Sequence, residues 1–330
     1  MTTAGQTLAM GESEKVLSRP SVQAPFGKAL VGVAKRRRDV VGLTADLGKY
    51  TDIGPFRDAF PDRFFNVGMA EQNLIAIAAG MARTGWIPFC TTYCVFATRR
   101  AYDFLAIACA HSRLNVKIVA GLPGLTTGYG GTHQGIEDLT LACAIPNLTV
   151  IDPCDATDLE QVTNAIADYD GPVYMRLLRG EVPWVLDPES YQFEIGRATL
   201  LQRGEDVGII STGLMTERAL DASKELAQEG IRAAVLHVPT LKPLDVEAIC
   251  DLASSVGLLV TAENHVVRGG LGTMVADILI EKGVVKPLIK IGLPDQFIEC
   301  GSVPYLQTKY GLLTSHIVAK IKATLKTSAP

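Results

Sequence analysis

The sequence lacks a long hydrophobic run and a surplus of charge of either sign, and aromatic residues make up only 6% of it. The longest uninterrupted apolar run, residues 74–82, has nine residues, whereas a membrane-spanning helix needs about 20. The 31 Lys and Arg residues against 35 Asp and Glu give a formal net charge of −4. Because nucleic acids and anionic membranes select basic surfaces, neither is expected as a partner.

Paired cysteines are also missing. None of the seven cysteines forms a Cys-x-x-Cys motif, and Cys90 and Cys94 have no histidine or second pair nearby to complete a zinc site. We interpret the cysteines as small core residues in a reducing compartment, which predicts a cytoplasmic location. Residues 1–20 lack the apolar segment of a secretory signal and are expected to form a flexible arm.

What the sequence does contain is a regular alternation of apolar and amphipathic segments along its 330 residues. This pattern predicts an α/β fold in which helices cover both faces of parallel sheets. Residues 179–191, rich in proline, glycine and charge, predict an exposed crossing between two domains, 21–186 and 192–330. The predicted strands are residues 40–43, 115–121, 148–151, 173–177, 207–210, 233–238, 257–262 and 288–291, and the predicted helices are 26–37, 70–82, 100–112, 155–169, 216–229, 245–253 and 274–282.

Two short segments carry residues that suit catalysis or ring binding. Glu71 lies in the first turn of a predicted helix, directly after the break at Gly68. An acid at this place also stabilises the helix dipole, so a purely structural role stays open. Tyr93 and Phe96 are three residues apart, just before another predicted helix, and this spacing is also typical of core aromatics.

A glycine-rich segment, residues 124–138, follows the predicted strand that ends near Gly121 and contains His133. Loops at the carboxyl ends of parallel strands are where such sheets bind ligands, so His133 is a better functional candidate than a core histidine. The segment fails the dinucleotide fingerprint Gly-x-Gly-x-x-Gly because His133 stands where the last glycine would be.

Together these segments resemble the pyrimidine-binding domain of the transketolase family of thiamine diphosphate enzymes. The family's glutamate segment is similar to residues 66–82, its aromatic segment to residues 91–103, and its Thr-His-Gln signature to Thr132-His133-Gln134. Residues 197–282 resemble its C-terminal domain, with Leu241-Lys-Pro-Leu-Asp245 and Thr261-Ala-Glu-Asn264. The resemblance covers about residues 25–320 and implies two α/β domains, each a parallel sheet sandwiched between helices.

The resemblance implies that Glu71 and two aromatic residues bind the cofactor. Glu71 would contact a ring nitrogen of the aminopyrimidine and so help the cofactor to lose its thiazolium proton, as a catalytic and cofactor-binding residue. Tyr93 and Phe96 would stack on the flat pyrimidine ring, which suits any aromatic face.

The resemblance assigns the substrate to other residues. His133 would act as a catalytic residue that orients or protonates substrate oxygens, with Tyr129 and Gln134 in the same substrate loop. Arg179 would bind the substrate phosphate, since a guanidinium donates a bidentate fork, although a surface ion pair is the alternative. Family members carry an acid where this sequence has Tyr129, which favours a bulkier, flatter or branched sugar phosphate.

Family enzymes bind Mg²⁺ and the diphosphate through Gly-Asp-Gly and a downstream Asn, and this sequence has no Gly-Asp-Gly and no Asn-Asn. It also begins where the second half of a transketolase would begin. The resemblance therefore implies the second subunit of a split enzyme, without a metal site of its own, in a heterotetramer with an N-terminal subunit that holds Mg²⁺. A mean hydropathy of +0.21 agrees with a large apolar interface.

The implied reaction is the transfer of a two-carbon ketol unit between phosphorylated sugars, with apulose 4-phosphate as an example of a branched substrate. Three alternatives stay open: a 1-deoxyxylulose-5-phosphate synthase-like activity, the beta subunit of a 2-oxo-acid dehydrogenase, and a non-catalytic subunit that only binds a partner.

Overall fold

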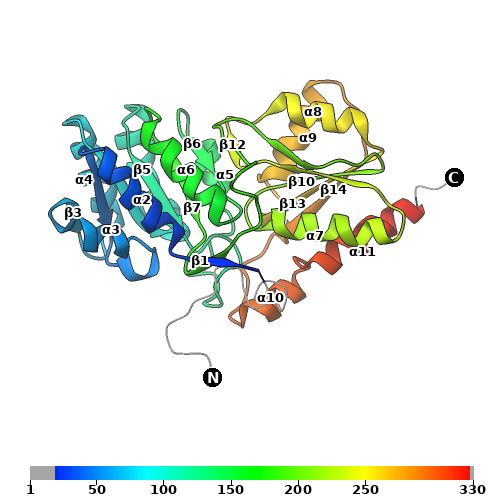
Figure 1. Cartoon of the computed structure of the whole chain (residues 1–330), viewed down its shortest axis with the longest axis horizontal. Coiled ribbons are helices and arrows are strands. Elements are labelled where there is room, and N and C mark those ends of the chain that lie inside the picture. The colour runs from blue at the N-terminus through cyan, green and yellow to red at the C-terminus, as the bar shows by residue number, and fades with distance from the viewer. Residues whose placement is uncertain (1–18, 328–330) are drawn as a thin grey trace.

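The computed structural model of the chain describes residues 19–327, which form two central β-sheets lying side by side with helices against their faces (Figure 1). The predicted flexible arm lies outside the described residues except for Arg19 and Pro20. Within the described part, no helix is long and apolar enough to cross a membrane.

The first sheet has seven strands in the order β12-β6-β7-β5-β4-β2-β3, all parallel to their neighbours except β12. Helices α2, α3 and α6 pack in one hydrophobic cluster against one face, and α4, η4 and α5 in a second cluster against the other. The strands are β2 (Val40–Thr44), β3 (Phe64–Asn66), β4 (Ile87–Tyr93), β5 (Lys117–Gly121), β6 (Thr149–Ile151), β7 (Val173–Leu177) and β12 (Thr240–Lys242). The helices are α2 (Pro25–Arg36), η1 (Gly48–Tyr50), α3 (Gly54–Ala59), η2 (Pro61–Arg63), α4 (Glu71–Arg83), η3 (Phe96–Arg100), η4 (Phe104–His111), α5 (Asp138–Ala144) and α6 (Ala156–Asp168).

The second sheet has five strands in the order β14-β13-β10-β11-β9, of which only the edge strand β9 is antiparallel. Helices α7 and α11 pack together on one face, and α8 and α9 on the other. Its elements are β9 (Thr199–Gln202), β10 (Val207–Ser211), α7 (Met215–Gln228), β11 (Ala233–His237), α8 (Val246–Ser255), β13 (Leu258–Val266), α9 (Leu271–Glu281), β14 (Leu288–Leu293), α10 (Val303–Lys309) and α11 (Thr314–Thr327).

Local sequence explains the regular elements well. In α2, Pro25 opens the helix, and Phe26, Leu30 and Val33 recur on one buried face at helical spacing. In α6, Asp155 caps the helix, because its side chain accepts a hydrogen bond of 2.7 Å from the backbone N–H of Asp158.

The predicted α/β class is confirmed, and the structure corrects several of its details. Both sheets carry one antiparallel edge strand, so neither is purely parallel, and β12 joins the first sheet although it follows the first strands of the second. The central strand β4 was not predicted, and β14 does not end the series, because α10 and α11 follow it. The helix predicted at 100–112 is π-helical over η4, and a second π-helical segment, η3, precedes it.

A further correction concerns residues 179–191, which were expected to be an exposed crossing. Within it β8 (Glu181–Pro183) pairs antiparallel with β1 (Ser21–Gln23), and Val182 and Pro183 are buried, whereas Trp184 and residues 187–190 are exposed. Leu186 and Tyr191 are also buried, with Cys154, in a small apolar cluster. The expectation of an exposed crossing therefore holds for residues 187–190 and is wrong for the strand β8.

Candidate active site

A cavity of about 550 Å³ opens at the carboxyl ends of β2, β3, β4, β5 and β7 of the first sheet. This edge is where the loops that follow parallel strands converge, and such edges bind ligands in open α/β sheets. The lining residues are Ala45, Leu47, Tyr50, Met69, Glu71, Tyr93, Phe96, Arg100, Tyr129, His133 and Arg179.

Glu71 is the first residue of α4, and the chain reaches it through a turn in which Gly68 has a φ of +76°. The side chain is buried, and the N–H groups of the first helical turn favour a negative charge there. Its Oε1 accepts a hydrogen bond of 3.2 Å from Nη1 of Arg100, whose guanidinium lies 4.0 Å from the ring centroid of Phe96. Arg100, which the sequence analysis did not single out, thus covers the carboxylate.

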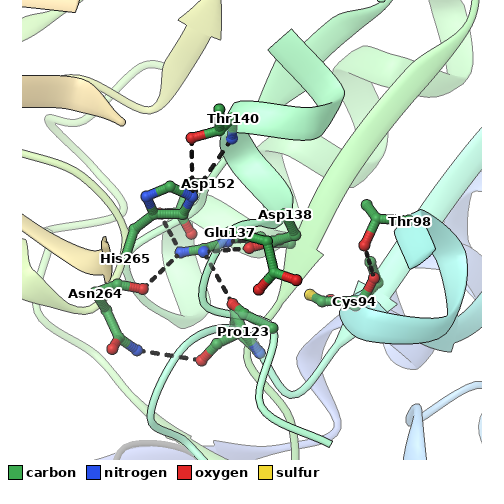
Figure 2. A network of polar contacts seen from close by, with 12 residues as sticks. Cys94, Thr98, Pro123, Glu137, Asp138, Thr140, Asp152, Asn264 and His265 are labelled. Carbon is green, nitrogen blue, oxygen red and sulfur yellow. Dashed lines mark hydrogen bonds and ion pairs between the residues drawn. The ribbon is translucent and has the colours of Figure 1, made fainter. Parts of the chain in front are cut away.

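Tyr93 and Phe96 form an aromatic wall of the cavity. Tyr93 ends β4 and Phe96 begins η3, so the sharp change from strand to π-helix places the two ring centroids 5.7 Å apart. Thr98 supports this change by donating a hydrogen bond of 2.7 Å to the backbone carbonyl of Cys94 (Figure 2). Burial raises the pKa of Tyr93, so its phenol stays protonated at neutral pH.

His133 faces this aromatic wall from the loop after β5. Its ring lies edge-on to Phe96 and to Tyr129, with centroids 5.5 Å apart in both pairs. Nδ1 of His133 is 2.8 Å from the hydroxyl of Thr132. Tyr129 is 66% exposed at the mouth of the cavity, so its ring is available to an incoming molecule.

Gln134 is the one predicted site residue that does not line the cavity. It is fully buried, and its Nε2 donates a hydrogen bond of 3.1 Å to the carbonyl of Thr127. The structure therefore places Gln134 inside the loop that carries Tyr129 and His133, where it holds the loop together.

Arg179 lines the cavity just after β7, and its Nε is buried without a hydrogen-bond partner among the described residues. The next residue, Gly180, donates its backbone N–H to Asp52 at 2.6 Å. Burial raises the pKa of Asp52, and the Gly180 N–H and the Arg179 charge oppose this shift. No sequence pattern pointed to Asp52, which lies in the loop after β2.

A buried ionic network surrounds Arg176 of β7. Arg176 donates to Asp138 at 3.0 Å through Nε and to Asp152 at 3.3 Å through Nη1, and Tyr174 donates to Asp138 at 2.7 Å. Nη1 of Arg176 also donates to the backbone carbonyl of Asn264. Figure 2 shows Asp138, Asp152 and Asn264 close together in this network. Burial alone would raise the pKa of Asp138, but the charge of Arg176 lowers it below its usual value. The aspartate therefore stays ionised, which keeps the network rigid.

The cavity lining fits the flat pyrimidine ring of a thiamine cofactor better than its Mg²⁺-bound diphosphate. A buried carboxyl beside two aromatic rings suits a flat heterocycle with a ring nitrogen. Glu71 is the one acid among the described lining residues, so they offer no carboxylate set for Mg²⁺. The group Cys154, Asp158 and His237 has ligand-like geometry elsewhere, but it is buried, and His237 lies 3.0 Å from Asp158 in a hydrogen bond.

Two family models cover most of the chain. Residues 18–185 match the model described as transketolase, pyrimidine binding domain, and residues 196–317 match transketolase, C-terminal domain. The chain belongs to the transketolase family. The predicted resemblance is thus confirmed.

This transketolase-family chain is similar to several known proteins along most of its length. It is 55% identical over 322 residues to the transketolase family protein y4mN of Sinorhizobium fredii, covering 97% of this chain and 93% of the relative. It is 42% identical over 290 residues to the 6-deoxy-6-sulfo-D-fructose transketolase subunit SqwH of Clostridium sp., covering 88% of this chain and 89% of the relative. A solved structure described as "Split gene transketolase, inactive beta4 tetramer" matches with a TM-score of 0.85 and 42% identity, covering 93% of this chain and 98% of the solved chain.

Longer relatives match only in part. The chain is 36% identical over 303 residues to the 1-deoxy-D-xylulose-5-phosphate synthase of Desulforudis audaxviator, which covers 91% of this chain but 48% of the synthase. The chain therefore spans about half the length of that enzyme.

Proposed function

We propose that this chain is one subunit of a two-chain transketolase-like enzyme that uses thiamine diphosphate to transfer a two-carbon ketol unit between phosphorylated sugars. The observation that carries the proposal is the buried Glu71 carboxyl beside the Tyr93 and Phe96 rings in one cavity. The relatives named as a transketolase subunit and a split gene transketolase support it.

Three residues would hold the cofactor. Glu71 would share a proton with a ring nitrogen of the aminopyrimidine, and Tyr93 and Phe96 would flank the ring. When bound, the cofactor supplies a carbon nucleophile. Because Glu71 is only 3% exposed, a hydrogen bond to its carboxyl is stronger than it would be in water. Arg100 contacts only Oε1 of Glu71, at 3.2 Å, and a carboxyl has a second oxygen that can bind a ring nitrogen while this contact is kept.

The remaining lining residues would recognise the sugar phosphate. His133 would orient or protonate sugar oxygens from its place against the aromatic wall. The Nε of Arg179, which has no hydrogen-bond partner among residues 19–327, would bind the phosphate. Tyr129 replaces a small acidic side chain with an exposed ring, which favours a flatter or branched sugar such as apulose 4-phosphate.

The partner would be an N-terminal transketolase subunit that binds Mg²⁺ and the diphosphate. Two features support this division. The described lining residues offer no second carboxylate for a metal, and Met69 and Tyr129 expose 81% and 66% of their surface at the cavity. Exposed apolar groups around a binding site suit a protein interface, and we propose a heterotetramer of two chains of each kind. The seven free cysteines agree with a cytoplasmic location.

The second candidate is a 1-deoxyxylulose-5-phosphate synthase-like reaction, favoured by the 36% identity to such a synthase. The two reactions differ in the donor, which is a ketose phosphate in the first and pyruvate in the second. Assaying the reconstituted complex with each donor separates them.

The proposal is tested with Glu71→Gln in the complex with the partner subunit. We expect kcat to fall about a hundredfold or more, because an amide cannot share the proton that a carboxyl shares with a ring nitrogen. Glu160→Gln, an exposed change on α6, is the matched control and should leave kcat unchanged. An unchanged kcat in Glu71→Gln would contradict the proposal.

A further inference from the structure

The loop that carries Tyr129 and His133 has a strained backbone. This loop, residues 122–135 (the His133 loop), connects β5 to the start of α5 without regular structure. Leu122 and Gly124 have φ values of +56° and +55°. A left-handed conformation is unfavourable for leucine, so it persists only where neighbouring groups determine the backbone. The neighbours that do so come from the second sheet.

Asn264, in β13, binds the His133 loop through both ends of its side-chain amide. Its Oδ1 accepts the backbone N–H of Leu125 at 2.9 Å. Its Nδ2 donates to the carbonyl of Pro123 at 3.1 Å, as Figure 2 shows. Asn264 is 2% exposed, so water cannot replace these bonds. An amide carries one acceptor and one donor group, which is what this pair of backbone groups requires.

The loop lies directly on Asn264. A Cβ added to Gly124 would overlap with both the backbone and the side chain of Asn264, so only glycine permits this approach. The backbone N–H of Gly124 also donates to the carbonyl of Gly135 at 2.7 Å, which closes the base of the loop two residues after His133. A shift at Asn264 is thereby transmitted to both ends of the loop.

Two further contacts from the same half of the chain hold the rest of the loop. Gln307 in α10 donates from Nε2 to the carbonyl of Leu125 at 2.9 Å, and Arg218 donates to Oε1 of Gln307 at 2.6 Å. The backbone N–H of Gly301 donates to the carbonyl of Gly128 at 3.1 Å. Gly128 precedes Tyr129, so this contact fixes the loop beside the cavity mouth.

We propose that Asn264 is a positioning residue, which sets the place of His133 and Tyr129 in the cavity although the second sheet contributes no lining residue. The expected effect of Asn264 on turnover rests on the proposed function, whereas its effect on the position of the His133 loop does not. Glu71, Tyr93 and Phe96 lie outside the His133 loop, so a change at Asn264 should separate substrate turnover from cofactor affinity. Misplacing a reacting group by about 1 Å can slow a reaction about a hundredfold.

The first test needs no activity. Hydrogen exchange of the full chain should show the amide of Leu125 exchanging about tenfold faster or more in Asn264→Ala, because the bond to Oδ1 is lost. Thr216→Val is the matched control, since Thr216 is fully buried in α7 and binds Ser211 and His237 instead of the loop. Equal Leu125 exchange in the wild type and Asn264→Ala would overturn the proposal.

The second test uses the complex with the partner subunit and the isosteric Asn264→Asp, which cannot donate to Pro123. We expect kcat/KM for the sugar to fall about tenfold or more, while the Kd for thiamine diphosphate stays within about twofold of the wild type. The proposal would be overturned if Asn264→Asp had the same kcat/KM as Thr216→Val. It would also be overturned if Asn264→Asp lost cofactor affinity by the same factor as kcat/KM.

A backup variant and the wild-type complex keep the two proposals distinguishable. If Asn264→Asp does not fold, Gln307→Glu removes the donor to Leu125 at a different place and must give the same separation between turnover and cofactor affinity. A wild-type complex without transferase activity would refute the proposed function, and the exchange experiment alone would then decide the positioning role.

Discussion

Arg179 offers the sharpest test of how the cavity recognises its substrate. Its Nε is buried on the cavity wall without a hydrogen-bond partner among the described residues, so the bond to an oxyanion would use a donor that is already desolvated. A hydrogen bond between charged groups contributes about 1.5–3 kcal/mol. Losing one such bond in Arg179→Ala should therefore lower kcat/KM for a phosphorylated sugar by about 10- to 150-fold.

The assay compares the same sugar with and without its phosphate in the complex with the partner subunit. The loss should be confined to the phosphorylated sugar and should appear mainly as a higher KM. Arg179→Lys keeps the charge but not the guanidinium fork, so it should give an intermediate loss. Arg203→Ala, an exposed change in the second half of the chain, is the control. An equal loss with both sugars would refute the phosphate role and leave Arg179 as a support for the Asp52 loop.

Three further predictions concern the cofactor wall and the buried charges. Phe96→Leu should weaken thiamine diphosphate binding by about 2- to 12-fold in a titration, because an aromatic contact contributes about 0.5–1.5 kcal/mol. Arg176→Met should lower the free energy of unfolding in urea by about 3–5 kcal/mol, because Asp138 and Asp152 would stay buried without their cation. Burial lowers the pKa of Lys117 to about 7 from 10.5, so the unfolded chain binds more protons between these values. Unfolding should therefore require more urea as the pH rises from 7 towards 10, and Lys117→Met should remove that part of the rise.

The elements that the sequence predicted are those with a strong local signal. β7 was predicted at its observed bounds because four of its five residues are apolar, and α6 because Asp155 caps a periodic apolar face. β4 was missed although it lies between β2 and β5, because Pro88 and two threonines interrupt its apolar pattern. Its strand conformation depends on pairing with neighbours distant in the sequence, which no local pattern records.

For the site, the family motifs predicted which residues meet. Glu71, Tyr93, Phe96, His133 and Arg179 come from five separate loops or element ends, and the structure brings all of them to one cavity. Their chemical roles stay predictions.

Other site features had no signal in the motifs. Arg100 follows another arginine in a π-helical segment, so no helical period showed that it would turn towards Glu71. Asp52 acts through the backbone of Gly180, a contact between positions 128 residues apart.

The glycine-rich loop shows why a motif can be correctly located and still incompletely understood. Its glycines suggested a loop shaped around a ligand, yet Gly124 and Gly128 are instead the positions where the second half of the chain approaches most closely, at Asn264 and Gly301. In the same way, the Thr-His-Gln signature divides its roles, because His133 faces the cavity while Gln134 holds the loop from inside. A loop can present a histidine at a defined place only if other residues determine its backbone. The second sheet therefore shapes the cavity without contributing a single residue to its lining.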